Sequence, residues 1–213
     1  MTSPAARLVE ALSTEVDRAD PTVNRILDAA RELFTLFGVR RTSIDDVARR
    51  ARLSRNTVFR RLGSKDDLIA AVMQRELRQL ITEVNAVAAG SGTARQRLAI
   101  AFALTVTRVR ANPMFATAMA HRPDEALELA TLNAGTFLAV AVRYVAEVFG
   151  ADQARGGIPA DVDVLGAAEV IVRTLHSTVL TPEAVHPTAT EDDLRQFADK
   201  YLGPLLTGSR AGG

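Results

Sequence analysis

The chain of 213 residues contains no cysteine and no tryptophan, and only 5% of its residues are aromatic. Without cysteine, neither a disulfide framework nor thiolate chemistry is available. The three histidines, His121, His176 and His186, show no spacing that is typical of a metal site. The phosphate-binding GxxxxGK, dinucleotide-binding GxGxxG and nucleophile-elbow GxSxG patterns are also missing. These absences argue against an enzyme, and we expect no catalytic residue, no metal and no cofactor.

The chain also has no long apolar run. Its longest stretch without a charge, Leu129 to Val142, has 14 residues, which is fewer than the ~18 that a membrane-spanning helix needs. The first 20 residues carry four acids and lack the apolar segment of a signal peptide. We therefore expect a soluble, cytoplasmic protein that has no membrane partner.

Positive charge, by contrast, is concentrated in one segment. Between Arg40 and Lys65 there are nine basic and two acidic residues, a local charge of +7 in a chain whose formal total is +1. A short basic unit in an otherwise neutral helical protein is typical of a DNA-binding helix-turn-helix. The alternative is a charged face that only contacts solvent, as most charge clusters do.

Helix signals are dense around this basic segment. Asp20-Pro21 predicts the start of a helix that Gly38 closes. Capping boxes at Ser43 and Ser64 predict two further starts. Between them, Ser54 predicts a third helix that ends at Gly63, with Val58 and Leu62 facing inward.

Helical spacing of apolar residues continues to the end of the chain, with neither a strand pattern nor an internal repeat. The sequence predicts an all-α protein of about nine helices. The later helices are expected at 64–89, 93–111, up to 121, 123–149, 161–180 and 190–206, with a loop at 151–160. The expected divisions are an arm at 1–19, a helix-turn-helix domain at 20–66, a larger helical domain at 67–207 and a flexible tail at 208–213.

The segment from Ile26 to Leu68 resembles the TetR family of bacterial transcriptional regulators. The matching runs are ILDAARELF, FG, TSIDDVARRA, LS, NTVF and SKDDL. The resemblance implies three N-terminal helices that carry the helix-turn-helix. A fourth helix would link them to a six-helix domain for ligand binding and dimerisation.

Three positions depart from the family pattern. Arg52 stands in the turn where the family usually has glycine, and costs ~1 kcal/mol if its backbone is left-handed. Phe59 replaces the family's tyrosine in the recognition helix, so a hydroxyl contact to phosphate is lost. Phe59 could pack in the core or lie on the surface. Arg61 replaces the following histidine and can supply a charge-assisted bond to phosphate.

A recognition helix enters the major groove by its N-terminal end, so its first turns meet base edges. An arginine suits guanine, asparagine suits adenine, and a threonine methyl suits thymine. The predicted base-reading residues are Arg55, Asn56, Thr57 and Arg60. The predicted phosphate contacts are Thr42, Ser43, Arg52, Arg61 and Lys65, which lie at helix N-termini, in the turn or on the recognition helix.

The C-terminal part contains two apolar sets. By the resemblance, the last two helices form a four-helix dimer interface through Leu165, Ala168, Val172, Leu175, Val179, Leu194, Phe197 and Tyr201. Internal packing alone is the alternative for these residues. The predicted effector-pocket residues are Phe102, Met114, Phe115, Met119, Phe137, Tyr144 and His176, although plain core packing fits the aromatic and methionine residues equally well.

The stretch Leu129–Val142 offers only three polar side chains, Thr131, Asn133 and Thr136. This composition favours a lipophilic effector over a phosphorylated one. The sequence therefore predicts a ligand-responsive repressor that binds a pseudo-palindromic operator as a homodimer and that a small lipophilic effector releases. A helical enzyme and an architectural DNA-binding protein without an effector are the alternatives.

Overall fold

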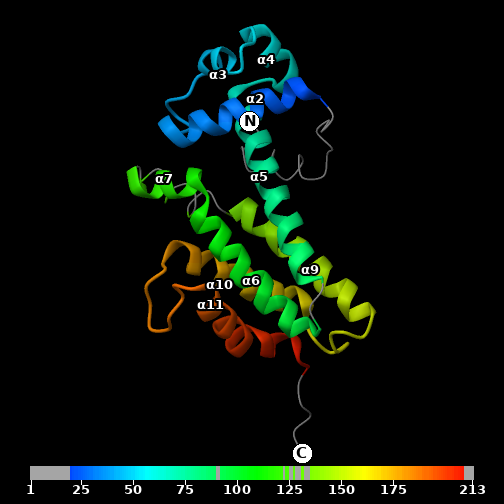
Figure 1. The fold of residues 1–213 in the computed structure, drawn as a ribbon. Coiled ribbons are helices and arrows are strands. Elements are labelled where there is room, and N and C mark those ends of the chain that lie inside the picture. The colour runs from blue at the N-terminus through cyan, green and yellow to red at the C-terminus, as the bar shows by residue number, and fades with distance from the viewer. Residues whose placement is uncertain are drawn as a thin grey trace, which may run out of the picture. The chain divides into compact units, whose positions relative to one another are not determined.

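The computed structural model describes residues 20–89, 92–121, 123, 124, 127, 131 and 135–208. These residues form helices joined by turns and loops, and no strand occurs among them (Figure 1). The all-α class that the sequence predicts is therefore confirmed. The predicted arm at 1–19 and the tail from 209 onward lie outside the described residues.

Nine α-helices follow one another in the described part of the chain. They are α2 (Pro21–Phe37), α3 (Ile44–Arg50), α4 (Arg55–Leu62), α5 (Lys65–Ala88), α6 (Ala94–Ala111), α7 (Pro113–His121), α9 (Gly135–Ala154), α10 (Val164–Leu180) and α11 (Glu191–Phe197). After α11 the chain continues as one π-helical turn, Ala198–Leu202, and one 3-10 turn, Gly203–Leu206.

The chain divides into two compact units. The first contains the residues up to Gln79 together with Ala111–Phe137, and the second contains Leu80–Arg110 and the residues from Leu138 onward. This division differs from the expected boundary at residue 66. The helix α7 belongs to the first unit because it packs against α2, and because Met114 lies against the same core.

The predicted helix starts in the first unit are capped as expected. The Asp20 carboxylate accepts a hydrogen bond of 2.7 Å from the Thr22 N–H. The Ser43 hydroxyl accepts from the Asp46 N–H at 3.1 Å, and the Ser43 N–H donates to the Asp46 carboxylate at 3.0 Å. The same reciprocal pair forms between Ser64 and Asp67 before α5. Each cap satisfies backbone groups that a helix start otherwise leaves unpaired.

Several element boundaries after α6 differ from the prediction. The helix α9 continues through Gly150 and ends at Ala154 instead of Phe149, and the backbone turns at Gly156, where φ is +78°. The helix α10 begins at Val164 instead of Asp161, because the Asp163 carboxylate caps the Gly166 N–H at 3.0 Å. The expected long helix from residue 123 falls partly outside the described residues.

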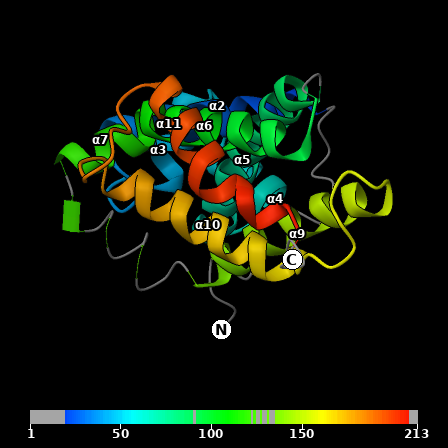
Figure 2. The same ribbon diagram turned by 90° about the horizontal axis from the view of Figure 1, so that it is seen from below.

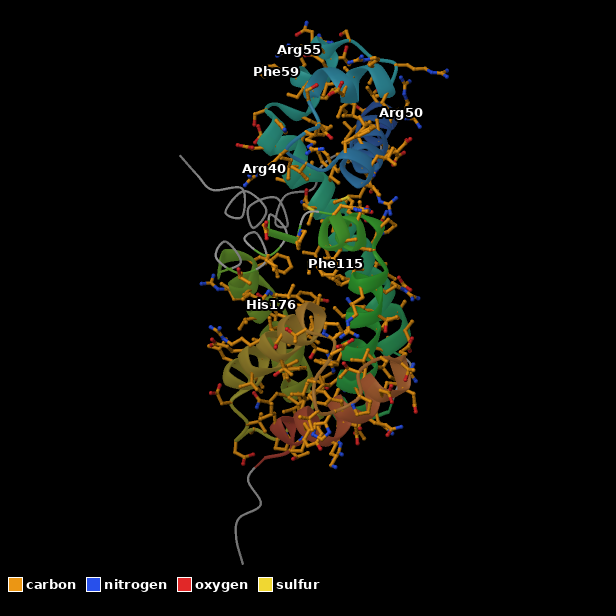
Figure 3. The ribbon with its side chains drawn as sticks, turned by 90° about the vertical axis from the view of Figure 1, so that its left-hand side faces the viewer. Arg40, Arg50, Arg55, Phe59, Phe115 and His176 are labelled. Atoms are coloured by element: carbon orange, nitrogen blue, oxygen red, sulfur yellow. The ribbon has the colours of Figure 1, made fainter. Side chains whose placement is uncertain are left out.

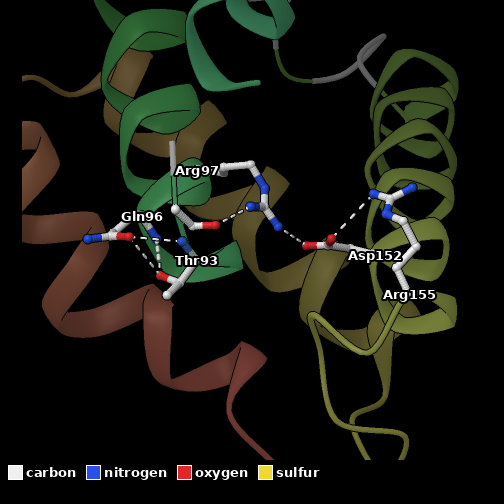
Figure 4. A network of polar contacts seen from close by, with 6 residues as sticks. Thr93, Gln96, Arg97, Asp152 and Arg155 are labelled. Carbon is white, nitrogen blue, oxygen red and sulfur yellow. Dashed lines mark hydrogen bonds and ion pairs between the residues drawn. The ribbon is translucent and has the colours of Figure 1, made fainter. Parts of the chain in front are cut away.

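Polar contacts between distant residues hold the second unit together. The Arg97 guanidinium pairs with the buried Asp152 carboxylate and also donates to the Gly92 carbonyl at 2.6 Å (Figure 4). Arg95 binds Asp199 through two hydrogen bonds of 2.6 Å. Arg110 donates to the carbonyls of Thr178 and Thr188, each at 2.6 Å. These arginines of α6 connect it to α9, α10 and the C-terminal turns.

The last helices of the second unit lie next to each other. In two perpendicular views α10 runs beside α11 and the turns that follow it (Figures 1 and 2). The face of α10 that points into its own unit carries small and branched residues, Ala167, Ala168, Ile171 and Val172, all of them buried. Two other apolar residues of α10, Leu165 in its first turn and Val170, are exposed.

Candidate nucleic-acid interface

The helix α2 supplies the core on which the basic segment folds. Its buried residues pack against Val47 and Ala48 of α3, Val58 of α4 and Leu68 of α5. Val58 is only 1% exposed, as the sequence predicts for an inward residue of the third helix. The two short basic helices are therefore fixed by one apolar face each, and their charged faces remain in solvent.

The turn between α3 and α4 has a defined geometry. The Leu53 N–H donates to the Ala48 carbonyl at 2.9 Å, and the Arg52 N–H donates to the Arg49 carbonyl at 3.2 Å. This pair of bonds is the Schellman arrangement, which places its C′ residue in the left-handed region. Arg52 occupies that position with a φ of +55°, the only positive φ among the described non-glycine residues. The Arg25 guanidinium supports the turn by donating to the Ala51 carbonyl at 2.9 Å.

The helix α4 presents a basic surface that begins at its first residue. Its N-cap, Ser54, accepts from the Thr57 N–H at 3.0 Å, and the hydroxyls of Ser54 and Thr57 share a bond of 2.8 Å. Arg55, Asn56 and Arg60 are exposed, as base-reading residues must be. Phe59 is 58% exposed, so it lies on the surface and not in the core. Figure 3 shows Arg55 and Phe59 on this helix.

Three of the predicted DNA-contacting cations have partners within the first unit. The guanidinium of Arg55 lies 3.0 Å from the Asp45 carboxylate, and that of Arg61 lies 2.9 Å from the Asp20 carboxylate. The Lys65 ammonium donates to the Arg40 carbonyl at 3.0 Å. The pKa of Asp20 is lowered, first by the hydrogen bond from the Thr22 N–H and then by the positive charge of Arg61. A phosphate or base that binds these cations must share or replace those partners.

Thr42 is not placed as the sequence predicts. Its side chain is 3% exposed, and its hydroxyl donates to the Gly38 carbonyl at 2.9 Å inside the unit. The side chain therefore cannot reach a phosphate in this structure, which corrects the prediction for that residue. Ser43 is exposed, but its N–H and hydroxyl both bond to Asp46. Both residues act first as structural elements of the start of α3.

Two open grooves border the basic surface along α2 and α3. One has a volume of about 420 Å³ and the other about 580 Å³, and both are lined by Arg50 and Arg52. Arg40 and Arg50 also lie at the surface of this unit (Figure 3). The exposed cations thus extend beyond the recognition helix to the neighbouring turn and helix, which is the distribution that contacts to both bases and phosphates require.

The sequence of this basic segment matches a known protein family. Residues 26–72 match the family described as "Bacterial regulatory proteins, tetR family". The chain carries the DNA-binding domain of the TetR family. An uncharacterized HTH-type transcriptional regulator of Mycobacterium tuberculosis is 33% identical over 99 residues, which cover 46% of this chain and 49% of that protein. The match thus spans about half the length of that relative.

Solved structures extend the similarity to the whole fold. The TetR family repressor AlkX from Dietzia sp. is 19% identical, with 89% of this chain and 96% of that chain covered and a TM-score of 0.63. FadR from Bacillus subtilis in complex with stearoyl-CoA is 18% identical, with 88% and 99% covered and a TM-score of 0.55. At these identities the similarity shows the fold, a TetR-type helix-turn-helix domain followed by a helical C-terminal domain.

The residues predicted for a TetR-type effector pocket are divided between the two units. Met114, Phe115, Met119 and Phe137 belong to the first unit, whereas Phe102, Tyr144 and His176 belong to the second. Phe102 is 1% exposed and packs against Phe197 at a ring-centroid distance of 6.1 Å, so it is part of the core of its unit. The Tyr144 hydroxyl bonds to the Asn85 side chain at 2.9 Å. The pocket remains a prediction.

The prediction of the dimer-interface residues is corrected in part. Ala168, Val172, Val179 and Leu194 are buried within their own chain and cannot face a partner. Two other predicted residues, Leu165 and Tyr201, are exposed, and so is Val170, which the prediction did not include. Leu175 and Phe197 are half-buried. The α10 residues predicted for the dimer interface thus lie mainly on the face of the helix that packs into its own unit.

Sequence reasoning missed three residues that support the predicted DNA-contacting region. Asp45, Asp20 and Arg25 each bind a residue of the α3–α4 region at a separation of 10 to 41 residues in sequence. Opposite charge alone could not have selected these pairs. Among the described residues, no helix has the length and apolar character needed to cross a bilayer, and no group of acidic or histidine residues could hold a metal ion.

Proposed function

We propose that this TetR-family regulator is a repressor that acts in the cytoplasm and binds a pseudo-palindromic operator as a dimer. A small lipophilic effector would release it. The observation that carries the proposal is the capped helix-turn-helix, whose recognition helix exposes Arg55, Asn56 and Arg60 from its first turns. Helices presented in this way read base edges in the major groove.

Contacts to bases and to phosphates are assigned to different residues. Base reading is proposed for Arg55, Asn56, Arg60 and the methyl group of Thr57, because the Thr57 hydroxyl is already bonded to Ser54. Phosphate contacts are proposed for Ser43, Arg52, Arg61 and Lys65. Phosphate contacts fix the register of the protein on DNA, whereas base contacts select the sequence.

Dimerisation is proposed through exposed apolar residues of α10 and of the π-helical turn after α11. Leu165 is 56% exposed, Val170 47% and Tyr201 41%. Exposed apolar side chains on two adjacent helices favour an interaction surface. A dimer with twofold symmetry would place two recognition helices on two half-sites, which is why the operator is expected to be pseudo-palindromic.

The proposed effector is lipophilic because polar residues are scarce in the segment 129–142. The names of two proteins with the same fold support this class. One was crystallised with stearoyl-CoA, and the other is implicated in the biodegradation of n-alkanes. For the present protein, an aliphatic chain is the part of such a molecule that the composition favours.

A polar network in the first unit offers a route by which an effector could alter DNA binding. Glu76 of α5 lies 2.8 Å from the Arg31 guanidinium of α2, and it accepts a hydrogen bond of 3.0 Å from Asn112. The Asn112 side chain also caps α7 by accepting from the Met114 N–H at 2.9 Å. A displacement of the start of α7 would therefore also shift α2 and α5, which support the recognition helix. Coupling of this kind requires two states that the ligand binds differently.

The test is binding of the full chain to the DNA upstream of its own gene, measured over a series of salt concentrations. Each neutralised phosphate adds about −0.9 to the slope of log K against log salt, so a dimer should show a slope of roughly −5 or steeper. Sedimentation would establish the dimer, and a panel of fatty acids, acyl-CoA esters and alkanes would test release. Equal affinity for this DNA and for random DNA, or salt-independent binding, would contradict the proposal.

A further inference from the structure

The first residue of the recognition helix is held by an acid from the preceding helix. The Nη1 atom of Arg55 donates to Oδ2 of Asp45 at 3.0 Å, and the two residues are ten positions apart. Asp45 lies in the first turn of α3, and Arg55 is the first residue of α4. Both side chains remain accessible to DNA, with 70% of Arg55 and 53% of Asp45 exposed.

This ion pair connects two rigid pieces of backbone. The start of α3 is fixed by the Ser43–Asp46 capping box, and the start of α4 is fixed by Ser54. The intervening turn is closed by the two hydrogen bonds of the Schellman arrangement. Because the backbone is fixed at both helix starts, the Asp45 carboxylate lies where it can hold the Arg55 guanidinium at the start of the recognition helix.

Arg55 also has a particular need for such a partner. A cation at the N-terminus of a helix is disfavoured by the helix dipole, and no acid lies within α4 itself. Asp45, at the N-terminus of α3, is favoured by the dipole of its own helix. The bond to Nη1 leaves the Nη2 and Nε donors of Arg55 unassigned. A guanidinium needs two parallel donors for a bidentate contact to guanine.

We propose that Asp45 is a specificity-determining residue that positions Arg55 for one base pair in each half-site. The inference rests on the proposed function, because it requires that α4 reads DNA. With Asp45 in place, Arg55 is pre-organised for the base edge, and less side-chain freedom is lost on binding. Without it, Arg55 can follow any nearby phosphate. Asp45 would therefore lower binding to all DNA slightly and raise the preference for the correct base.

The chain offers a matched control in the Asp20–Arg61 pair. Arg61 also lies on α4, and its Nη1 atom is 2.9 Å from Oδ2 of Asp20. Asp20→Asn removes a carboxylate beside a recognition-helix arginine, just as Asp45→Asn does. Asparagine retains the ability to cap α2, because it is as good an N-cap residue as aspartate. Arg61 is a proposed phosphate contact, so its release should affect all sequences alike.

The experiment is selection from a pool of duplex DNA with a randomised centre, using the full-length wild type and the variants Asp45→Asn, Asp45→Glu, Asp20→Asn and Arg55→Ala. Sequencing of the bound fraction gives the base preference at each position. We expect Asp45→Asn to reduce the preference at one base pair per half-site by roughly tenfold, the size of the loss of one well-oriented bidentate contact. Asp45→Asn should also bind random duplexes at least as tightly as the wild type.

The controls separate positioning from charge and from folding. Asp20→Asn should leave every base preference unchanged, and Asp45→Glu should restore part of the lost preference because it retains the carboxylate. In an Arg55→Ala background, Asp45→Asn should have no further effect at that base pair. Circular dichroism of each variant verifies that the helices are retained.

The outcomes distinguish this inference from the function on which it rests. If the wild type selects a sequence and Asp45→Asn selects the same one with undiminished preference, Asp45 has no role in specificity and only this inference is overturned. The same conclusion follows if Asp20→Asn reduces the preference as much as Asp45→Asn does. If the wild type selects no sequence at all, the proposed function fails and the inference falls with it.

Discussion

The two units of this protein differ in how far along the sequence their polar contacts reach. In the first, the helix starts are fixed by side chains two or three residues away, as at Asp20, Ser43 and Ser54. In the second, helix starts are capped in the same way, but polar pairs reach farther along the sequence, as between Arg95 and Asp199, which are separated by 104 positions. Local signals are visible in a sequence, whereas distant pairs are not. The contrast therefore explains which features a sequence can predict, and it also predicts where each unit is most vulnerable.

The largest effect is expected from the Arg97–Asp152 ion pair of the second unit. Asp152 is 11% exposed at its side chain, and its partner Arg97 is 28% exposed. Asp152→Ala would leave a largely buried guanidinium without its carboxylate, and should lower the free energy of unfolding by about 2–3 kcal/mol. Urea unfolding would measure the loss, and amide hydrogen exchange would localise it to α6 and α9.

Arg155→Ala provides the comparison for that experiment. Arg155 also contacts Asp152, at 3.3 Å, but its side chain is 70% exposed (Figure 4). Its removal should therefore cost less than about 0.5 kcal/mol, as is usual for exposed ion pairs. Equal losses of unfolding free energy in the two variants would show that burial of the Arg97–Asp152 pair does not determine its contribution to stability.

An intermediate effect, with the opposite sign, is expected in the first unit at Arg52. Its backbone is left-handed, a conformation that glycine adopts without strain. Arg52→Gly should raise the free energy of unfolding by about 1 kcal/mol. The same change should weaken operator binding and flatten the salt slope by about 0.9 per subunit, if Arg52 contacts one phosphate.

Arg52→Ala separates the two contributions of that residue. Alanine removes the guanidinium but retains the strained backbone, so it should weaken DNA binding without the gain in stability. Thermal unfolding and operator binding of both variants are the measurements. A destabilised Arg52→Gly variant would mean that contacts of the arginine side chain outweigh the strain of its backbone.

The success of sequence-based prediction follows the same distinction between local and distant contacts. The caps at Asp20, Ser43, Ser54 and Ser64 could be predicted because the cap and its helix are neighbours in sequence. The exposed basic face of α4 could be predicted for the same reason. The buried position of Thr42 could not, because its hydroxyl bonds to the carbonyl of Gly38 in a turn whose path the sequence did not define.

In the second unit, helical spacing gave the existence of α10 but not its orientation. A stripe such as Ala168, Val172 and Val179 has the same pattern whether it faces its own core or a second subunit, and here it faces the core. The helix α9 also ends later than predicted, because Gly150 is accommodated inside it and the turn occurs at Gly156. The orientation of α10 and the end of α9 depend on the residues that pack against them, which the helical spacing does not identify.

The smallest effect concerns the pH dependence of two carboxylates, one in each unit. The pKa of Asp46 is lowered chiefly by hydrogen bonds from the Ser43 side chain and backbone, and the pKa of Asp199 is lowered chiefly by hydrogen bonds from Arg95. A carboxyl whose pKa is depressed in the folded state stabilises the protein above its unfolded pKa. That contribution disappears as the pH falls through the folded value. Both groups therefore contribute at neutral pH and stop contributing in acid.

The pKa of Asp46 is lowered by a residue three positions away, and that of Asp199 by a residue 104 positions away. Substitution of each partner can separate the two effects. Ser43→Ala should return the pKa of Asp46 toward its ordinary value and leave Asp199 unchanged, whereas Arg95→Ala should do the reverse. Carboxyl chemical shifts followed by NMR over an acid titration would measure each pKa directly. Because the Arg95 contact is lost when the second unit opens, mild urea should raise the pKa of Asp199 together with unfolding of that unit. If both pKa values rise at one urea concentration in the wild type, the two units unfold as one, and the difference in how they are held has no consequence for their stability.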